Sequence, residues 1–325
     1  NRKNKIISLF IYLIGSLKSH FHARYKNCTI FHYHLFGSSI LVLFNMLLAK
    51  LLFAKITITI HDVKSFSSES SFKLYSRLIY FFSDTIITHN EYSFKEIIEK
   101  NTSLSHKTSI IPHGNYLPFI KIKEDQKASR IKLGIKKEKK VLLFFGMIKK
   151  VKGLDILLSS LPKVIEKHSS LVLLIAGKPW KDDFSYYQKL IDELSISKYC
   201  KLDIKFISHS DVPYYYSAAD IVILPYRKIY QSGVLMMSLS YKKPVVVSDL
   251  PSFKEIIDDN RTGYVFESEN SLDLSRVINK ALDNPKLLEE IKENGYNLIA
   301  SDYKWETIGK HTVDAYLKIN YFSKK

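Results

Sequence analysis

The sequence is poor in cysteine, with only Cys28 and Cys200 in 325 residues. The two lie far apart and form no Cys-x-x-Cys pair, which argues against a disulfide-stapled domain and against a zinc site built on cysteine. This cysteine usage is typical of a reduced, cytoplasmic compartment. We expect both side chains to fill the core.

Signatures of several other protein classes are also absent. No Gly-x-Gly-x-x-Gly follows a strand-like run, which disfavours a NAD-dependent oxidoreductase with two Rossmann domains. No Asp-x-Asp follows a strand at the expected site, so we predict no catalytic metal and no cofactor. The net charge is +17, but the chain shows no nucleic-acid-binding motif and no arginine-rich tract. The charge therefore predicts a phosphorylated substrate or an anionic membrane surface as partner, and not nucleic acid.

Two apolar runs lie near the N-terminus, "IISLFIYLIG" and "SSILVLFNMLLAKLLFAKITITI". The first is followed by no small-residue cleavage site of a signal peptide. The second is interrupted by Asn45, Lys50 and Lys55, so it offers no clean span of about 20 apolar residues. We expect both to be partly buried helices, which either contact lipid headgroups through their lysines or belong wholly to the core.

Short apolar runs alternate with amphipathic segments along the whole chain, as in parallel sheets covered by helices on both faces. The pattern predicts an α/β fold with two Rossmann-like domains that face each other across a cleft. We place the first domain at residues 1–120, a polar linker at 121–138, the second domain at 139–310, and a helix crossing back to the first domain at 311–325. The expected strands are 28–34, 55–60, 84–89, 108–112, 141–146, 171–177, 202–208, 220–225, 244–249 and 263–266.

The segment "IYQSGVLMMS" (229–238) joins a strand-like run to a helix-like one. A helix that begins after a small polar loop presents free backbone N–H groups, which suit a phosphate. The groups would be those of Ser232, Gly233 and Val234, next to Gln231. The alternative is that Ser232 only caps the helix.

Other candidates for donor binding end strands at the same edge of the second domain. Lys152 precedes Gly153 at the start of a helix, which places an ammonium beside a second helix N-terminus. A solvated surface lysine is the alternative for Lys152 alone. Gly177 and Tyr226 follow two further strands, and either Lys149 or Lys150 adds a second positive charge.

The segments "FFGMIKKVKGLDILLSSLP", "LLIAGKPW", "AADIVILPYRKIYQSGVLMMSLSYKKPVVVSDLPSFKEIIDDNRTGYVF" and "IIPHGNY" resemble the retaining glycosyltransferases of family 4, also called group 1, which have the GT-B fold. The likeness is strongest between residues 140 and 267. It implies sugar transfer from a nucleotide-sugar donor that the second domain binds, with the acceptor held mainly by the first domain.

The resemblance implies roles for single residues. Lys152 matches the lysine that neutralises the leaving diphosphate, while Met147 stands where the family has an arginine. Ile229 and Met237 replace the two glutamates of the E-x7-E motif, so the Gln-Ser-Gly loop stands in for the first one. Glu255 matches a later glutamate and is the candidate for the ribose or sugar hydroxyls. Its alternative role is to favour a helix dipole.

Histidines end several strands of the first domain. His61 matches the histidine that contacts the donor sugar near the anomeric carbon, and we predict that it is catalytic together with Lys152. The candidates on the acceptor side or in the cleft are His34, His113 and Asn115, while His89 is a weaker one. A polar residue with satisfied hydrogen bonds is the alternative for each histidine.

The combined hypothesis is a metal-independent, retaining glycosyltransferase in polysaccharide biosynthesis, for instance of lipopolysaccharide or O-antigen. Its donor would be a UDP- or GDP-sugar, and its acceptor a lipid-linked or cell-surface glycan precursor. It would be cytoplasmic or peripheral on the inner face of the cell membrane. The family's first strand and its glycine-rich loop are missing, so we expect an N-terminally truncated first domain. A catalytically inactive nucleotide-sugar-binding domain is the alternative.

Overall fold

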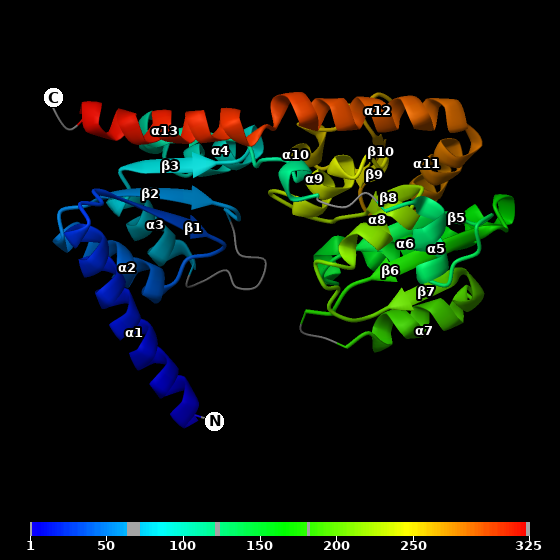
Figure 1. The fold of residues 1–325 in the computed structure, drawn as a ribbon, viewed down its shortest axis with the longest axis horizontal. Helices are drawn as coiled ribbons and strands as arrows, with labels where there is room; N and C mark the ends of the chain where they lie inside the picture. Colours follow the sequence, from blue (N-terminus) through cyan, green and yellow to red (C-terminus); the bar gives the residue numbers. More distant parts are fainter. Residues whose placement is uncertain (1, 64–71, 121–123, 181–182, 323–325) are drawn as a thin grey trace. The chain divides into compact units, whose positions relative to one another are not determined.

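A computed structural model describes residues 2–63, 72–120, 124–180 and 183–322. The chain divides into two compact units (Figure 1). The first holds the residues up to His113 and those from Ile308 onward, and the second is Gly114–Thr307. The first boundary lies before the expected position of 120, and the last helix joins the first unit at 308 instead of 311.

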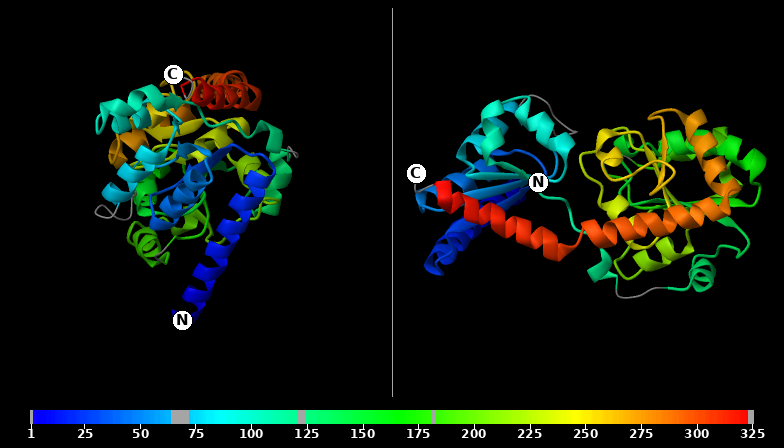
Figure 2. Two further views of the ribbon diagram at one scale, coloured as in Figure 1. Left: turned by 90° about the vertical axis from the view of Figure 1, so that its left-hand side faces the viewer. Right: turned by 90° about the horizontal axis from the view of Figure 1, so that it is seen from above.

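The first unit contains a four-stranded parallel sheet in the order β1-β2-β3-β4. The strands are β1 (Ile30–Leu35), β2 (Lys55–Ile60), β3 (Thr85–Thr88) and β4 (Thr108–Ile110), as the sequence predicts. The helices are α1 (Arg2–Tyr25), α2 (Ile40–Leu51), α3 (Phe72–Phe82), α4 (Glu91–Ile98) and α13 (Trp305–Phe322). Helix α2 contacts α3, and Tyr80 of α3 lies near Glu96 of α4. Helix α13 packs on the sheet through Ile308 and Ala315, which cluster with Ile87 of β3 (Figure 2).

The second unit contains a six-stranded parallel sheet in the order β10-β9-β8-β5-β6-β7. Its strands are β5 (Lys140–Phe145), β6 (Leu171–Ala176), β7 (Cys200–Asp203), β8 (Ile221–Leu224), β9 (Val245–Ser248) and β10 (Tyr264–Phe266). One hydrophobic core joins the sheet to α6 (Leu154–Lys167), α7 (Ser185–Glu193) and α11 (Ser271–Asp283). A second core lies on the other face, under α8 (Val212–Ala218), α9 (Gly233–Ser240), α10 (Pro251–Lys254) and α12 (Pro285–Asp302). Two buried faces explain why these strands read as continuous apolar runs.

Two expectations were wrong in part. The strand expected at 202–208 is β7, which begins at Cys200 and ends at Asp203, and Phe206 beyond it is 72% exposed. Cys28 of the first unit is exposed and fills no core, whereas Cys200 is half-buried and packs against the core of the second unit.

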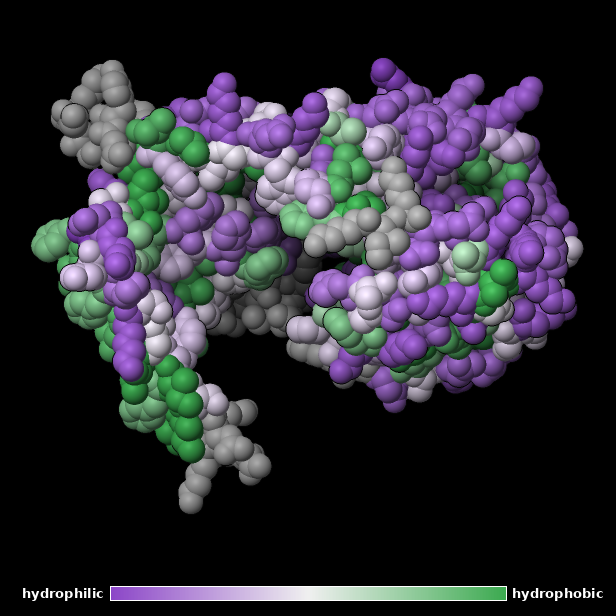
Figure 3. Space-filling view, in the orientation of Figure 1, coloured by the Kyte–Doolittle hydropathy of each residue, from purple (hydrophilic) through white to green (hydrophobic). Residues whose placement is uncertain are grey.

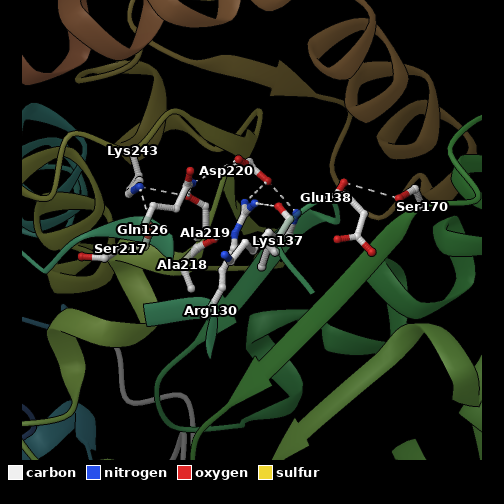
Figure 4. A network of polar contacts seen from close by, with 11 residues as sticks. Gln126, Arg130, Lys137, Glu138, Ser170, Ser217, Ala218, Ala219, Asp220 and Lys243 are labelled. Carbon is white, nitrogen blue, oxygen red and sulfur yellow. Dashed lines mark hydrogen bonds and ion pairs between the residues drawn. The ribbon is translucent and has the colours of Figure 1, made fainter. Parts of the chain in front are cut away.

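The expected linker is also wrong in its described part. Residues Gln126–Lys132 form α5 of the second unit, where Arg130 donates to the carbonyl oxygens of Ala218 (3.1 Å) and Lys137 (2.7 Å). The same guanidinium lies 2.8 Å from the Asp220 carboxylate, which also accepts from the backbone N–H of Val141 (Figure 4). This network fastens α5 to the strands β5 and β8.

Helix α1 is not the partly buried helix that we expected. From Ile6 to Tyr25 it is long and apolar enough to cross a membrane by length and composition, and only 6% of that window is buried. Green atoms mark its apolar surface in Figure 3. Its exposed large side chains are Ile6, Ile7, Leu9, Phe10, Ile11, Tyr12, Ile14, Leu17, Phe21 and Tyr25. Helix α2 behaves as expected, with five buried residues against the sheet.

The Arg130 network generates a stability prediction. Arg130→Ala leaves the Asp220 carboxylate without its cation, while the Arg130 side chain is only 8% exposed. We expect the free energy of unfolding of the second unit to fall by about 3 kcal/mol, since removing one partner strands a desolvated charge. Both tryptophans of the chain, Trp180 and Trp305, lie in this unit, so tryptophan fluorescence in urea follows its unfolding selectively.

Lys189→Ala is the matched control. Lys189 and Glu193 form an exposed pair on α7, with 78% and 58% of the side chains accessible. Such a pair contributes less than about 0.5 kcal/mol. Equal urea midpoints for the two variants would contradict the structural role of Arg130.

Candidate functional site

Two glycines at the carboxyl ends of β5 and β6 bring their loops into backbone contact. Gly146 has φ +95° and Gly177 has φ +155°. A Cβ atom on Gly177 would lie 1.9 Å from the Gly146 carbonyl oxygen, so no other residue fits there without moving the backbone. The two loops therefore form one tightly packed floor at this edge of the sheet.

Gly153 fixes the other end of the β5–α6 loop in the same way. It stands between the 3₁₀ turn Lys150–Lys152 and α6, in the left-handed region with φ +64°. A Cβ atom there would lie 1.9 Å from the Pro225 carbonyl oxygen, just beyond β8. The lysine turn is therefore held against the end of β8, which positions Lys152.

The Lys152 ammonium lies above this floor. A Cβ atom on Gly146 would be 3.2 Å from its Nζ atom, and Nζ is 5.5 Å from the centroid of the Tyr226 ring. Burial, with a smaller contribution from the charge of Lys149, lowers the pKa of Lys152 to about 8. In the described part of the chain no carboxylate forms an ion pair with Lys152. A desolvated cation without an anionic neighbour is a site for an anionic ligand.

The N-terminus of α9 borders the same space. Ser232 caps the helix, and its hydroxyl accepts from the backbone N–H of Leu235 at 3.1 Å. The capping alternative is thus correct for the side chain, but it leaves the N–H groups of Ser232, Gly233 and Val234 without a hydrogen-bond partner among the described residues. The Val234 side chain is 3.4 Å from the Cβ position of Gly146, the position that Lys152 also approaches. Lys152 and the first turn of α9 therefore flank one small space.

Three other positive groups near this space differ in availability. Lys149 is half-buried, and its Nζ lies 4.7 Å from the centroid of the Trp180 ring, whereas Lys150 is exposed. Arg227 is bound by both oxygens of Asp155, at 2.8 and 2.7 Å, and this pairing raises its pKa. Lys149 is therefore the second cation that remains available.

Two predicted site residues are placed differently from expectation. Tyr226 is 1% exposed and packs on Phe253 in the core, so it supports Lys152 and does not line an open pocket. Asn115 is 3% exposed, and its amide donates to the Ile299 carbonyl and accepts from the Leu117 N–H, so it is a structural residue of the second unit. Glu255 ends α10, and its side chain is exposed.

The histidines of the first unit gather at the carboxyl edge of its sheet. His34 Nδ1 lies 3.1 Å from His61 Nε2, and His61 Nδ1 lies 3.3 Å from His89 Nε2. His89 Nδ1 lies 2.9 Å from the Ile111 carbonyl oxygen, and its ring is 5.9 Å from that of His113. The structure thus joins His34, His61, His89 and His113, which the sequence placed only at separate strand ends. We call this group the histidine row.

His32 extends this row. Its two ring nitrogens lie 2.6 Å from the Tyr316 hydroxyl and 2.7 Å from the Thr59 hydroxyl, and its ring stacks on His34. Burial lowers the pKa of His32 to about 4. No three His, Cys, Asp or Glu side chains are arranged to hold a metal ion within the described ranges.

Two features of the site were not expected from the sequence: Gly146, and the pair of Arg227 with Asp155. A glycine directly after the strand β5 was a visible signal for the first. The second had none, because the two residues are 72 positions apart and meet only when β8 and α6 pack in the same unit.

Comparisons with known proteins agree with this geometry. The family model described as glycosyl transferases group 1 matches residues 125–298. Spore coat protein SA of Bacillus subtilis is 23% identical over 248 residues, which cover 72% of this chain and 64% of that protein. Lipopolysaccharide 1,2-N-acetylglucosaminetransferase of Salmonella typhimurium is 28% identical over 211 residues, which cover 62% of this chain and 54% of that protein. The chain thus spans less than two thirds of the length of these relatives.

Solved structures show the same fold. Anabaena HepE in complex with UDP superposes with a TM-score of 0.79 at 16% identity, over 93% of this chain and 82% of that one. Its complex with UDP-glucose gives 0.75 at 17% identity, over 86% of this chain and 76% of that one. The fold is therefore GT-B, as the sequence predicted. Since the family model covers more than half of the residues, the chain belongs to the group 1 glycosyltransferases.

Proposed function

We propose that the chain transfers a sugar from a UDP- or GDP-sugar, with retention at the anomeric carbon, to a lipid-linked or cell-surface glycan precursor. The observation that carries this proposal is the Lys152 ammonium, which lies in a desolvated position without a carboxylate, beside the N–H groups of α9. HepE was solved with UDP and with UDP-glucose, which supports a nucleotide sugar as the donor.

In the proposed reaction the bond between the anomeric carbon and the diphosphate oxygen breaks, and negative charge develops on the diphosphate. Lys152 and the N–H groups of Ser232, Gly233 and Val234 stabilise that charge, and they need no reorganisation because the glycine floor fixes them. Lys149 supplies a second positive charge. The acceptor hydroxyl attacks on the face that the diphosphate leaves and passes its proton to the departing diphosphate oxygen, so no protein nucleophile takes part.

The other roles follow the family resemblance. We assign to His61, with His34 beside it, the recognition of the donor sugar near the anomeric carbon, and to His113 the acceptor side. Gln231, Gly177 and Glu255 would hold the remainder of the donor, with Glu255 on ribose or sugar hydroxyls. The positive charge for the leaving group comes from lysines in this proposal and not from a metal ion.

Replacement of Lys152 tests the diphosphate contact. Lys152→Met keeps the stem but removes a charge-assisted contact worth about 1.5–3 kcal/mol. We expect donor turnover, measured as release of nucleoside diphosphate, to fall at least ten- to a hundredfold while tryptophan fluorescence stays native. Lys150→Ala, at the exposed neighbour, is the control and should keep turnover within about twofold. Wild-type turnover in Lys152→Met would exclude this role.

The lowered pKa of Lys152 predicts that the affinity for UDP depends on pH. Lys152 carries its charge below its pKa of about 8 and loses it as the pH rises. The affinity for UDP, measured by calorimetry, should therefore fall between pH 7 and pH 9, and this fall should be absent in Lys152→Met. A bound diphosphate raises the pKa of Lys152. When UDP is saturating, Lys152 therefore loses its charge at a higher pH.

The α9 loop provides a second test. A Cβ atom on Gly233 would lie 3.0 Å from the Tyr116 hydroxyl, the movable end of a side chain, so Gly233→Val folds but crowds the approach to the backbone N–H groups. We expect Gly233→Val to abolish UDP binding, whereas Ser232→Ala costs about 1 kcal/mol of stability and retains most of the binding. Normal binding by Gly233→Val would place the diphosphate elsewhere.

We also propose that the chain associates with the inner face of the cell membrane through α1. The exposed apolar side chains of Phe10 and Ile11, 62% and 66% accessible, support the proposal together with the exposed Lys18, His22 and Lys26 on the same helix and just beyond it. Basic groups near anionic headgroups contribute roughly 1 kcal/mol each.

Co-sedimentation with liposomes tests this association. Binding should require anionic lipid, weaken with added salt and fall at least fivefold in Ile11→Asp. Val313→Asp adds the same charge to an exposed apolar position of α13, 51% accessible, and should bind as the wild type does. Equal binding to neutral vesicles, or none to either kind, would contradict the proposal.

The catalytically inactive alternative has a specific basis in Ile229 and Met237, which stand where the family has glutamates. It predicts calorimetric binding of UDP with no release of nucleoside diphosphate from any donor in a panel of UDP- and GDP-sugars. The turnover assay therefore decides between the two functions directly.

A further inference from the structure

The histidine row of the first unit has a direction that its hydrogen bonds determine. A carbonyl oxygen only accepts, so the Ile111 carbonyl, 2.9 Å from His89 Nδ1, requires that this nitrogen carry the proton. A neutral imidazole holds one N–H, and its second nitrogen is then an acceptor. His89 Nε2 is therefore the acceptor for the next ring.

His61 is the next ring, and it is bound on both sides. Its Nδ1 lies 3.3 Å from His89 Nε2 and must donate, which leaves His61 Nε2 as an acceptor. His34 Nδ1 lies 3.1 Å from that atom and must donate in turn. The last nitrogen, His34 Nε2, then holds a bare lone pair on an exposed side chain, and no described residue bonds to it.

Packing keeps the rings in this order. His61 stacks on Phe36 with the ring planes 7° apart, and His34 stacks on His32. His32 is itself held by the hydroxyls of Tyr316 and Thr59. A flipped ring would lose its hydrogen bond on one side, so the orientation of each imidazole supports that of the next.

We propose that the Ile111 carbonyl sets the tautomers of His89, His61 and His34 in series, so that His34 Nε2 is a fixed hydrogen-bond acceptor for a sugar hydroxyl. His89 and His61 are then positioning residues, and His34 is the one that touches substrate. The hydroxyl assignment rests on the proposed glycosyl transfer, while the relay itself rests only on the geometry of the row. Burial lowers the pKa of His89 to about 4, which keeps its ring neutral at working pH.

His61 then acts on the sugar through His34. Both of its ring nitrogens take part in the row, so a direct contact of His61 with the donor would break the bond to His34. The structure assigns the available nitrogen to His34 instead. His34→Asn keeps an N–H donor near His61 but removes the acceptor at the Nε2 position. It therefore separates the hydrogen bond to His61 from the proposed hydrogen bond with a sugar hydroxyl.

Ring-nitrogen NMR on the full chain labelled with ¹⁵N-histidine tests the relay at pH 8. We expect His89, His61 and His34 to carry their protons on Nδ1, although an imidazole in water prefers the proton on Nε2. His89→Leu removes the first acceptor, and His61 and His34 should then shift toward the Nε2–H form. His106→Leu, at an exposed histidine outside the row, should leave both tautomers unchanged.

Failure of the tautomer relay can be told apart from failure of the proposed glycosyl transfer. An Nε2 proton on His61 or His34 in the wild type overturns the proposal, and this measurement needs no variant to fold. An unchanged spectrum of both rings in a folded His89→Leu also overturns it. Since the tautomers are read without turnover, an enzyme that transfers no sugar can still show the relay, and an active enzyme can lack it.

Discussion

The candidate donor site depends on backbone packing that only glycine permits. The Gly146 carbonyl lies where a side chain of Gly177 would be, and the Pro225 carbonyl lies where a side chain of Gly153 would be. These two contacts fasten the loops after β5, β6 and β8 together, and Lys152 is carried on the loop after β5. Any added methyl group would separate the loops, so the position of the ammonium is a consequence of missing Cβ atoms.

The basic composition is used in two different ways. Arg130 and Arg227 are paired with Asp220 and Asp155, so their charges hold the second unit together. Lys152 has no such partner, and burial lowers its pKa. A protein rarely keeps a desolvated cation unpaired unless a ligand compensates it, which is why Lys152 indicates function where the arginines indicate structure.

In the first unit, the histidine row depends on a single backbone group. One backbone carbonyl, that of Ile111, fixes the proton positions of three side chains, because each imidazole has one donor and one acceptor. Parallel strands make this possible, since their carboxyl ends bring His34, His61 and His89 to one edge. Sugar recognition needs acceptors of known orientation, and the row supplies one at His34.

The sequence by itself determined the α/β class, the ten strands and the edge at which Lys152 and the α9 loop meet, because apolar periodicity and glycine positions are local signals. Tertiary structure alone decided that Tyr226 and Asn115 are buried, that α5 belongs to the second unit, and that α1 exposes its apolar side chains. It also decided the order of the histidine row. Burial and hydrogen-bond partners depend on residues distant in the chain, as with Asn115 and Ile299, and no local pattern encodes them.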